Sequence, residues 1–580
     1  MMKQDEPRRV LIYQVLPRLY GNTCETCRPN GSLAENGCGK MADFSASRLG
    51  RIAAFGFTHI WYTGLLEHAT QTDYSAFGIR PDCPDVVKGR AGSPYAVKDY
   101  YDIDPDLAVE PARRMEEFEA LVERTHRAGL RIVMDFIPNH VARQYHSDAC
   151  PPGATDLGAG DDCGCAFSTR NNFYYIPGES LHTDALAGAT GAYQEFPARA
   201  TGNDRFTAWP SQDDWYETVK LNYGVDYLGG RTKYFPPLSE LASVPDSALP
   251  DTWRKMTDIL LFWAGKGIDA FRCDMAEMVP VEFWNHAIRR VKSQFPEVVF
   301  IAEVYNPSEY RNYIYGGGFD YLYDKVGLYD TLRAVVCGWQ PATAITRCWQ
   351  AVDDIRPHML NFLENHDEQR IASRFFAGDA QRALPALVVS ASMGTSPFMV
   401  YAGQELGEAA EDAEGFSGAD GRTTIFDYWS VSSLRKLLRG TRYFTDAEKR
   451  LYDYYRRVMT LQNTEPALRE GSFFDLMYAQ PATVSGSGSP NFYAFLRKSE
   501  GQVVLVVANF GAADADVELV IPQHAFDCLK ILPGTKCFRD LLTDGMQLKV
   551  PFSPEQPFSI ALPAYGSRLL AFDEVADAAG

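Results

Sequence analysis

Residues 115–136, MEEFEALVERTHRAGLRIVMDF, combine the signs of a helix with those of a buried strand. Apolar residues between Met115 and Val122 recur at helical spacing, and Gly129 stands where a helix typically ends. Residues 131–136, RIVMDF, are almost entirely apolar, as a parallel strand covered on both faces is expected to be. The segment therefore predicts a helix followed by a strand, which is the repeating unit of an α/β fold.

The same unit recurs along the chain from residue 9 to about residue 405. Residues 253–266 show helical spacing, Gly267 interrupts them, and the strand IDAFRCD follows at residues 268–274. Eight such strands predict a closed (β/α)8 TIM barrel, with an open doubly wound sheet as the alternative. The expected strands are RVLIYQVLP (9–17), THIWYTG (58–64), RIVMDF (131–136), IDAFRCD (268–274), VVFIAEV (298–304), FDYLYDK (319–325), HMLNFLEN (358–365) and PFMVYAGQE (397–405).

Two further domains are expected beside the barrel. The stretch between the third and fourth strands is rich in Gly, Asn, Asp and Tyr and is too long for an ordinary barrel loop, so residues 141–250 are predicted to form an inserted subdomain. The barrel then comprises residues 1–140 and 251–465. Short alternating segments such as FYAFLRKS and QVVLVVANF predict a C-terminal antiparallel β-sandwich over residues 466–580.

Composition narrows the range of partners. The chain has 580 residues and a formal net charge of −19, which would repel the phosphates of nucleic acids and anionic lipid surfaces. A neutral sugar polymer is compatible with this field. The run Val10–Tyr13 is too short for a signal peptide, and no apolar stretch approaches the roughly 18 residues of a membrane helix. We therefore expect a soluble, cytoplasmic protein; nothing in the sequence indicates its oligomeric state.

Twelve cysteines are too few in a chain of this length for a disulfide scaffold, so most are expected to be free thiols. Cys24 and Cys27 form a CxxC with Cys38 eleven residues beyond, which raises the alternative of a zinc site. The group lies in a segment rich in Gly and Asn and does not supply four ligands at finger-like spacing. Loop cysteines without a metal are the preferred interpretation, and no organic cofactor is expected.

Polar residues end several of the apolar strands, where the active sites of such barrels lie. A single Asp at a strand end is usually a helix cap or a turn residue, but here four strands end in this way. Such convergence favours a catalytic site. The strand-end residues are Asp135, Asn139, His140, Arg272, Asp274, Glu303, Asn365, His366 and Asp367.

Asp274 and Glu303 are predicted to be neighbours because they end consecutive strands of one βαβ unit, 29 residues apart. Adjacent strands lie about 4.8 Å apart, which is closer to the carboxyl separation of retaining glycosidases than to that of inverting ones. Arg272 lies two residues before Asp274 on the same face of the strand, and we expect it to keep that carboxylate ionised. The apolar run VVFIA before Glu303 predicts a desolvated carboxyl suited to be the acid.

The ordered segments DFIPNH, GIDAFRCD, AEV and FLENHD resemble the four short motifs of the alpha-amylase superfamily, glycoside hydrolase family 13. The resemblance implies that Asp274 is the nucleophile and Glu303 the general acid/base. It also implies that Asp367 is the carboxylate that grips and distorts the sugar in the reactive subsite. The likeness extends over essentially the whole chain.

The same resemblance nominates residues that bind the sugar. Arg272, His140 and His366 occupy motif positions that donate hydrogen bonds around the reactive sugar, and Asp135 occupies a supporting position. SPYAVKDYY is similar to the segment whose tyrosine stacks on the same ring, which nominates Tyr95.

Three features depart from the family pattern or leave a role open. Many amylases have Lys and His three and four residues after the nucleophile, and this chain has Glu277 and Met278. The acceptor side of the cleft is therefore expected to differ. Asn139 matches a calcium-ligand position, so the resemblance implies a possible calcium ion there. Finally, aromatic residues in the predicted subdomain either stack on sugar rings or form its core; they are Trp209, Trp215, Tyr216 and Tyr223.

The predicted function is that of a retaining hydrolase of α-1,4-glucosidic bonds in soluble α-glucans, such as maltodextrin and fragments of starch or glycogen. A 4-α-glucanotransferase or a maltosyl-transferring enzyme is the alternative, because hydrolases and transferases share one covalent intermediate. A non-catalytic sugar-binding relative is an alternative of another class. Loss of any of the three carboxylates would favour it, but all three are present.

Overall fold

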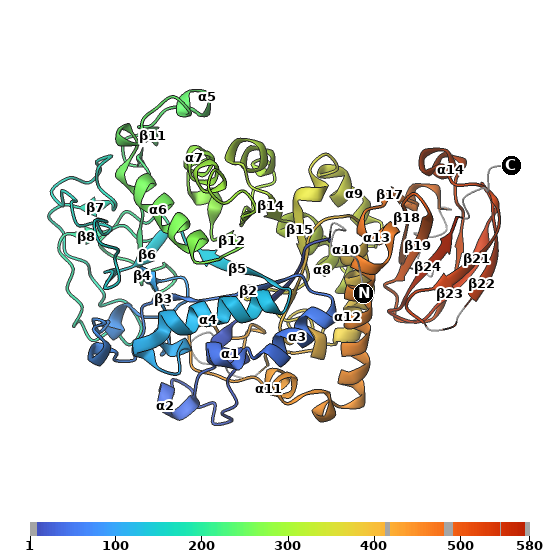
Figure 1. Ribbon diagram of the computed structural model, residues 1–580, viewed down its shortest axis with the longest axis horizontal. Coiled ribbons are helices and arrows are strands. Elements are labelled where there is room, and N and C mark those ends of the chain that lie inside the picture. Colours follow the sequence, from blue (N-terminus) through green and yellow to red (C-terminus); the bar gives the residue numbers. More distant parts are fainter. Residues whose placement is uncertain (1–7, 412–417, 481–490, 544, 546, 575–580) are drawn as a thin grey trace.

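The computed structural model describes residues 8–411, 418–480, 491–543, 545 and 547–574. Eight parallel strands form a closed barrel in the order β1-β16-β15-β14-β13-β12-β5-β2 (Figure 1). All eight predicted strands are therefore confirmed, and the barrel is closed. The strands are β1 (Leu11–Val15), β2 (His59–Tyr62), β5 (Arg131–Phe136), β12 (Ala270–Cys273), β13 (Val299–Ala302), β14 (Tyr321–Tyr323), β15 (Met359–Phe362) and β16 (Phe398–Tyr401).

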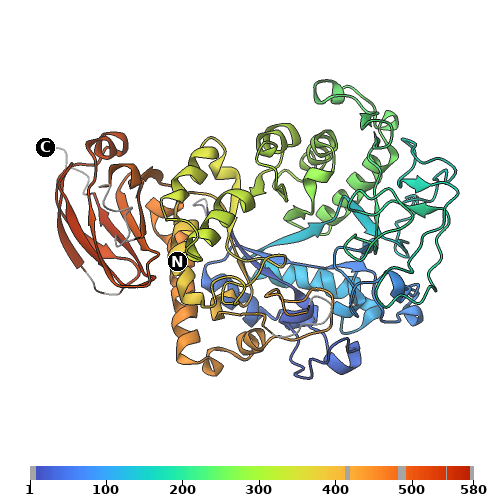
Figure 2. The same ribbon diagram turned by 180° about the vertical axis from the view of Figure 1, so that it is seen from behind.

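Helices pack around the outside of the barrel (Figure 2). The two predicted helices are confirmed as α4 and α6, and Gly129 and Gly267 follow them with φ of +77° and +93°, a conformation that favours glycine. No described helix is both long and apolar enough to cross a membrane. The helices are α1 (Pro17–Tyr20), α2 (Leu33–Asn36), α3 (Ala46–Phe55), α4 (Arg114–Arg127), α5 (Leu238–Leu241), α6 (Asp251–Gly265), α7 (Val281–Lys292), α8 (Asp330–Val336), α9 (Ala344–Ala351), α10 (Leu384–Ser392), α11 (Ser432–Arg439), α12 (Asp446–Thr464), α13 (Pro466–Arg469) and α14 (Gln523–Leu529).

The segment between β5 and α6 forms an irregular extension at one end of the barrel, as an inserted subdomain would (Figure 1). Its strands are short: β6 (His140–Ala142) pairs with β9 (Thr218–Lys220), β7 (Tyr175–Ile176) with β8 (Ala198–Arg199), and β10 (Val225–Asp226) with β11 (Thr232–Lys233). A further hairpin, β3 (Leu66–His68) with β4 (Val97–Ile103), lies between β2 and α4 in the chain. These segments bring side chains from outside the barrel to its carboxyl edge.

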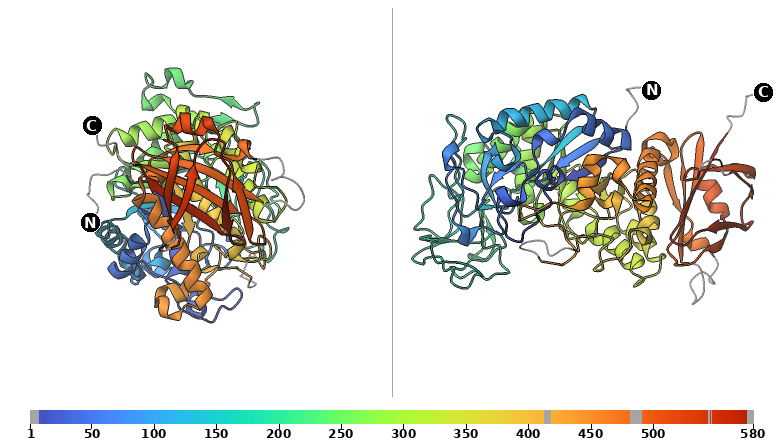
Figure 3. Two further views of the ribbon diagram at one scale, coloured as in Figure 1. Left: turned by 90° about the vertical axis from the view of Figure 1, so that its right-hand side faces the viewer. Right: turned by 90° about the horizontal axis from the view of Figure 1, so that it is seen from below.

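The C-terminal part of the chain is antiparallel, as predicted, and lies at the opposite end of the barrel from the inserted segment (Figure 3). Six strands form one sheet in the order β17-β18-β19-β24-β21-β22, and β20 pairs with β23 in a second, smaller sheet. The strands are β17 (Ser472–Asp475), β18 (Phe492–Lys498), β19 (Gln502–Asn509), β20 (Ala515–Leu519), β21 (Gly534–Asp540), β22 (Gln547–Phe552), β23 (Phe558–Leu562) and β24 (Ser567–Asp573).

Buried Arg497 joins this unit to the barrel. From β18 its guanidinium donates hydrogen bonds to the carbonyl oxygens of Ser392, at the end of α10, and of Gly394. It also donates to the carbonyl oxygen of Gly471, which precedes β17. Because three segments share one buried cation, the C-terminal unit is held against the barrel by specific polar contacts as well as by apolar packing.

Candidate active site

The three predicted carboxylates follow the carboxyl ends of barrel strands. Asp274 follows β12 and Glu303 follows β13, and Cys273 pairs in register with Ala302. The Glu303 N–H donates to the carbonyl oxygen of Cys273 at 3.1 Å, so the pairing continues to the two carboxylate residues. Asp367 follows β15. Because the strands are parallel neighbours or near neighbours, their ends bring the three side chains to one edge of the barrel.

The predicted site lies at one cavity of about 260 Å³. The three carboxylates line it together with Tyr95 and His140, while Arg272 and His366 lie buried beneath them. The structure thus brings all seven predicted catalytic and sugar-binding residues to one place. The lining residues are Lys88, Ser93, Tyr95, His140, Trp215, Glu217, Thr218, Asp274, Met275, Glu303, Tyr305, Asp367, Ile425 and Phe426.

Arg272 is the charge centre of the site and is fully buried. Its Nη1 lies 2.8 Å from Asp274 Oδ1 and 3.4 Å from Asp135 Oδ1. Its Nη2 lies 2.7 Å from Glu303 Oε2. The planar guanidinium also lies over the ring of Trp61, 5.3 Å from its centroid. One cation therefore pairs with three carboxylates, of which the sequence had predicted the pairing with Asp274.

The expectation that Arg272 simply keeps Asp274 ionised needs correction. Burial raises the pKa of Asp274 well above its usual value, Arg272 lowers it, and the charges of Glu303 and Asp367 raise it again. Desolvation, followed by the charge of Glu303, also raises the pKa of Asp367 to about 7, although 41% of its side chain is exposed. The cleft therefore holds more acidic groups than its single buried guanidinium can keep ionised.

The surroundings of Glu303 also differ from the apolar environment expected from VVFIA. Its Oε2 accepts a hydrogen bond from the Met275 N–H at 2.8 Å, in addition to the contact with Arg272. Its Oε1 accepts from the Tyr305 hydroxyl. Sequence reasoning missed Tyr305, although its place two residues beyond Glu303 gave a signal, since alternate residues of an extended chain share a face. The carboxyl group is thus oriented by polar donors on both of its oxygens.

Tyr95 and His366 form a stacked pair at the cavity. Their ring centroids are 5.1 Å apart with an interplanar angle of 14°, and the Tyr95 hydroxyl contacts His366 Nε2. Burial, followed by the charge of Arg272, lowers the pKa of His366 well below its usual value, so the ring is neutral. His366 Nε2 also lies 3.1 Å from Asp367 Oδ2. The pair therefore offers an aromatic face and neutral hydrogen-bonding groups beside a carboxylate.

The inserted segment contributes one wall of the cavity. His140, at the start of β6, lies against Trp215 with ring centroids 5.2 Å apart, and burial lowers the pKa of His140 to about 3. Four aromatic residues of this segment were predicted either to stack on sugar rings or to form the core of the subdomain, and the structure places them differently. Trp215 lines the cavity, Tyr216 and Tyr223 are buried, and Trp209 is 59% exposed away from the cavity lining.

The surroundings of Asn139 do not fit the calcium ion implied by the resemblance. Asn139 Oδ1 accepts a hydrogen bond from the buried ammonium of Lys220. The same Nζ lies 2.7 Å from Asp204 Oδ1 and 3.5 Å from the carbonyl oxygen of Met278. Calcium requires six to eight oxygen ligands and would be repelled by an adjacent ammonium. The structure therefore places the Lys220 ammonium where the family pattern implied a metal.

We expect Lys220→Met to destabilise the protein by about 1–3 kcal/mol, because it leaves Asn139 Oδ1 and the Asp204 carboxylate without their buried donor. Urea unfolding with and without calcium measures the effect, and calcium should not reduce the difference in stability between the variant and wild type. Lys266→Met is the matched control, since Lys266 pairs with Glu119 at the surface and its loss should cost at most about 1 kcal/mol. Equal stability of Lys220→Met and wild type would contradict the role given to this ammonium.

The cysteines of the CxxC contact separate partners. Cys27 Sγ lies 3.3 Å from the carbonyl oxygen of Ser430, and Cys24 Sγ lies 3.4 Å from that of Glu35. All twelve cysteines are free thiols. Within the described part of the chain, the one group of side chains close enough to hold a metal ion consists of carboxylates and contains no cysteine.

A closed parallel barrel with three carboxylates converging at its carboxyl edge has the layout of a (β/α)8-barrel glycosidase. The family model described as the alpha-amylase catalytic domain matches residues 33–150 and 245–425, just over half of the chain. The chain therefore belongs to the alpha-amylase family, as the motifs had indicated. The unmatched stretch between the two blocks falls within the inserted segment.

Individual relatives are distant. Neopullulanase 2 of Thermoactinomyces vulgaris is 22% identical over 446 residues, which cover 75% of this chain and 60% of that protein. A cyclomaltodextrinase of Bacillus sp is 22% identical over 525 residues, covering 89% of this chain and 75% of that protein. The chain thus spans less than two thirds of the length of the neopullulanase.

Solved structures share the fold. The maltogenic alpha-amylase AmyB of Thermotoga neapolitana superposes with a TM-score of 0.61 at 17% identity, covering 98% of this chain and 99% of that one. At this level of identity the likeness concerns the arrangement of the barrel and its neighbouring units.

Proposed function

We propose that the protein is a retaining glycoside hydrolase that cleaves α-1,4-glucosidic bonds in soluble α-glucans. The observation that carries the proposal is the placement of Asp274 and Glu303 on neighbouring parallel strands, with oxygens 2.8 and 2.7 Å from two nitrogens of the same Arg272 guanidinium. Two carboxyl groups bound to one guanidinium are close together. Such proximity is typical of retaining enzymes, because inverting enzymes keep room for a water molecule between the carboxyl groups.

In the proposed reaction, an Asp274 oxygen attacks the anomeric carbon while the Glu303 carboxylic acid gives its proton to the leaving glycosidic oxygen. The carbon–oxygen bond breaks, and the sugar is held as an ester of Asp274. A water molecule then attacks the same carbon, Glu303 takes up its proton, and the aspartate is released. The carboxylates of Asp367 and Asp274 stabilise the positive charge that develops on the sugar in the two transition states, while Arg272 holds Asp274 and Glu303 in position.

The substrate class rests on the shape of the site and on the relatives. The stacked Tyr95 and His366 rings provide an aromatic face, and sugars pack on such faces through their apolar side. The relatives are named for pullulan and cyclomaltodextrins, which are glucans, and a maltogenic amylase shares the fold. A neutral α-glucan is also compatible with the net charge of −19.

Digestion of maltoheptaose tests the proposal, with chain lengths resolved by chromatography and the anomeric form of the first products read by NMR. We expect shorter chains only, released in the α configuration. Products of inverted configuration would refute the retaining mechanism. No change in the substrate, with a correctly folded protein, would favour the non-catalytic sugar-binding alternative.

One observation favours transfer as the second candidate function. Glu277 Oε2 accepts hydrogen bonds from the backbone N–H groups of Tyr305 and Asn306, both at 3.0 Å. The carboxylate at this family position is thus tied to the segment after Glu303, so the acceptor side differs from that of amylases with lysine there. Chains longer than maltoheptaose in the same digestion would identify a glucanotransferase instead of a hydrolase.

A further inference from the structure

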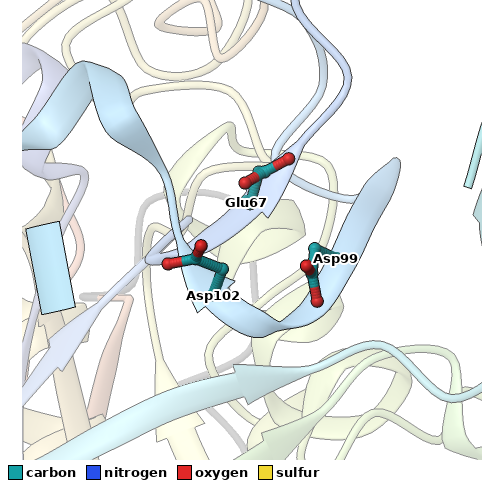
Figure 4. Close-up of side chains that lie close together, drawn as sticks. All are labelled: Glu67, Asp99 and Asp102. Atoms are coloured by element: carbon teal, nitrogen blue, oxygen red, sulfur yellow. The ribbon is translucent and has the colours of Figure 1, made fainter. Parts of the chain in front are cut away.

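Three buried carboxylates gather outside the active site, in the hairpin of β3 and β4. Glu67 lies on β3, and Asp99 and Asp102 lie on β4 (Figure 4). Each contributes an oxygen atom, and the three oxygens lie within 4.8 Å of one another. The exposed fractions of these residues are 1%, 0% and 4%. The register of the hairpin shifts on both sides of Glu67, so the strand is irregular at this residue.

Glu67 is the unusual member of this group. Among the residues that the structure describes, neither of its carboxylate oxygens has a hydrogen-bond partner. A buried carboxylate without a partner is costly, and buried polar groups are normally satisfied by protein atoms, water or an ion. The Glu67 carboxylate nevertheless lies close to two further acidic groups, with one oxygen of each of the three within 4.8 Å of the others (Figure 4). Ionised together, three buried carboxylates this close are unfavourable unless a positive ligand lies among them.

The protein neutralises only part of this charge. Asp102 is paired with Arg114 through Oδ2. Lys98, which neighbours the cluster in sequence, is instead paired with Asp82 at 3.0 Å. Three ionised carboxylates with only one guanidinium beside them keep a net negative charge. A divalent cation would balance that charge. The oxygens of the two aspartates are oriented by other donors, which fixes their direction as in preorganised metal sites.

We propose that Glu67, Asp99 and Asp102 form a binding site for one calcium ion. All the ligand atoms are oxygens, which suit hard cations. The site is irregular, with a bulged strand opposite a regular one, and calcium tolerates irregular coordination whereas magnesium demands nearly ideal octahedral geometry. This site is separate from the Asn139 position, where Lys220 takes the place of a metal.

The ion would join the barrel to the inserted segment. Asp99 Oδ1 accepts from the Ser147 hydroxyl at 2.6 Å, and Asp99 Oδ2 accepts from the Ala149 N–H at 3.0 Å. Both donors lie just beyond β6, the strand that begins with His140. Tyr95 lies four residues before Asp99 in the chain. An ion on Asp99 therefore stabilises the junction that carries one wall of the cavity.

Isothermal titration calorimetry on the full chain, stripped with chelator, tests the site directly. We expect one calcium ion per chain and at least a tenfold tighter affinity for calcium than for magnesium. Glu67→Gln keeps the shape of the side chain but removes its charge, and should weaken calcium binding by at least tenfold. Glu123→Gln on α4 is the matched control, since Glu123 is exposed and pairs only at the surface, and its affinity should equal that of wild type.

Thermal unfolding provides a second measurement that does not depend on calorimetry. At calcium concentrations about 100 times the wild-type Kd, the melting temperature of wild type should rise by about 2 °C, and that of Glu67→Gln by at most about half as much. Absence of calcium binding to the stripped wild type, or unchanged binding by a folded Glu67→Gln, would overturn the proposal. Tighter binding of magnesium would overturn the choice of ion. None of these outcomes bears on maltoheptaose cleavage, so this site and the proposed function are tested separately.

Discussion

Asp274→Asn is expected to lower kcat on maltoheptaose by on the order of 10⁴-fold or more, because the amide has the shape of the carboxylate but cannot form the covalent intermediate. The contacts of Arg272 with Asp135 and Glu303 remain, so substrate binding should change much less than turnover. Steady-state kinetics with chromatographic detection measures both quantities. Asp453→Asn, on an exposed face of α12, is a control that should leave kcat unchanged.

The same variant should be at least as stable as wild type at neutral and alkaline pH. Since burial raises the folded-state pKa of Asp274 above its unfolded value, ionising this group costs stability as pH rises between the two pKa values. The amide removes that cost. The gain in stability should therefore be present at pH 8 and vanish below about pH 3, where the carboxyl is protonated in both states. Turnover near that of wild type would refute the role of Asp274 as the nucleophile. A variant that no longer folds would refute the predicted gain in stability.

The barrel was predictable because its signals are local. Each strand is a short apolar run, and helices such as α4 and α6 have a periodic apolar face ended by a glycine at positive φ. The strand-end carboxylates were predictable for the same reason, since parallel strands in a closed barrel all end at one edge. The order of the strands then decides which side chains meet, and the neighbours β12 and β13 bring Asp274 to Glu303.

The contacts that the sequence did not predict depend on distant segments. Lys220 meets Asn139 because β6 pairs with β9 across a loop of about 75 residues, and no local pattern specifies that register. The contact of Arg272 with Asp135 could not be predicted from local sequence either, because Asp135 comes from a strand far away in the chain. The electrostatics of side chains depends on such non-local contacts. The predicted pairing of Arg272 with Asp274 was therefore only part of the observed network.

Arg272→Met is expected to impair both activity and stability, in contrast to Asp274→Asn. Methionine retains the apolar stem but leaves Asp135, Asp274 and Glu303 without their buried cation. Removing one partner of a buried ion pair typically costs about 3–5 kcal/mol. We expect a loss of that size in the free energy of unfolding and a fall in kcat on the order of 10³-fold, since the donor that orients both reacting carboxyl groups is gone. Urea unfolding and steady-state kinetics measure these effects.

The pH dependence of this loss distinguishes electrostatics from packing. Without the guanidinium, the folded-state pKa values of Asp135 and Asp274 rise further above their unfolded values, so stability falls more steeply as pH rises. The deficit of Arg272→Met should therefore be largest near pH 8 and shrink toward pH 5, whereas a packing defect would be equal at both. Arg272→Lys keeps a charge but cannot span two carboxylates, and should be intermediate. Asp274→Asn should raise stability more in the Arg272→Met background than in wild type, because there it removes a charge that has lost its partner; an equal gain in both backgrounds would contradict their coupling.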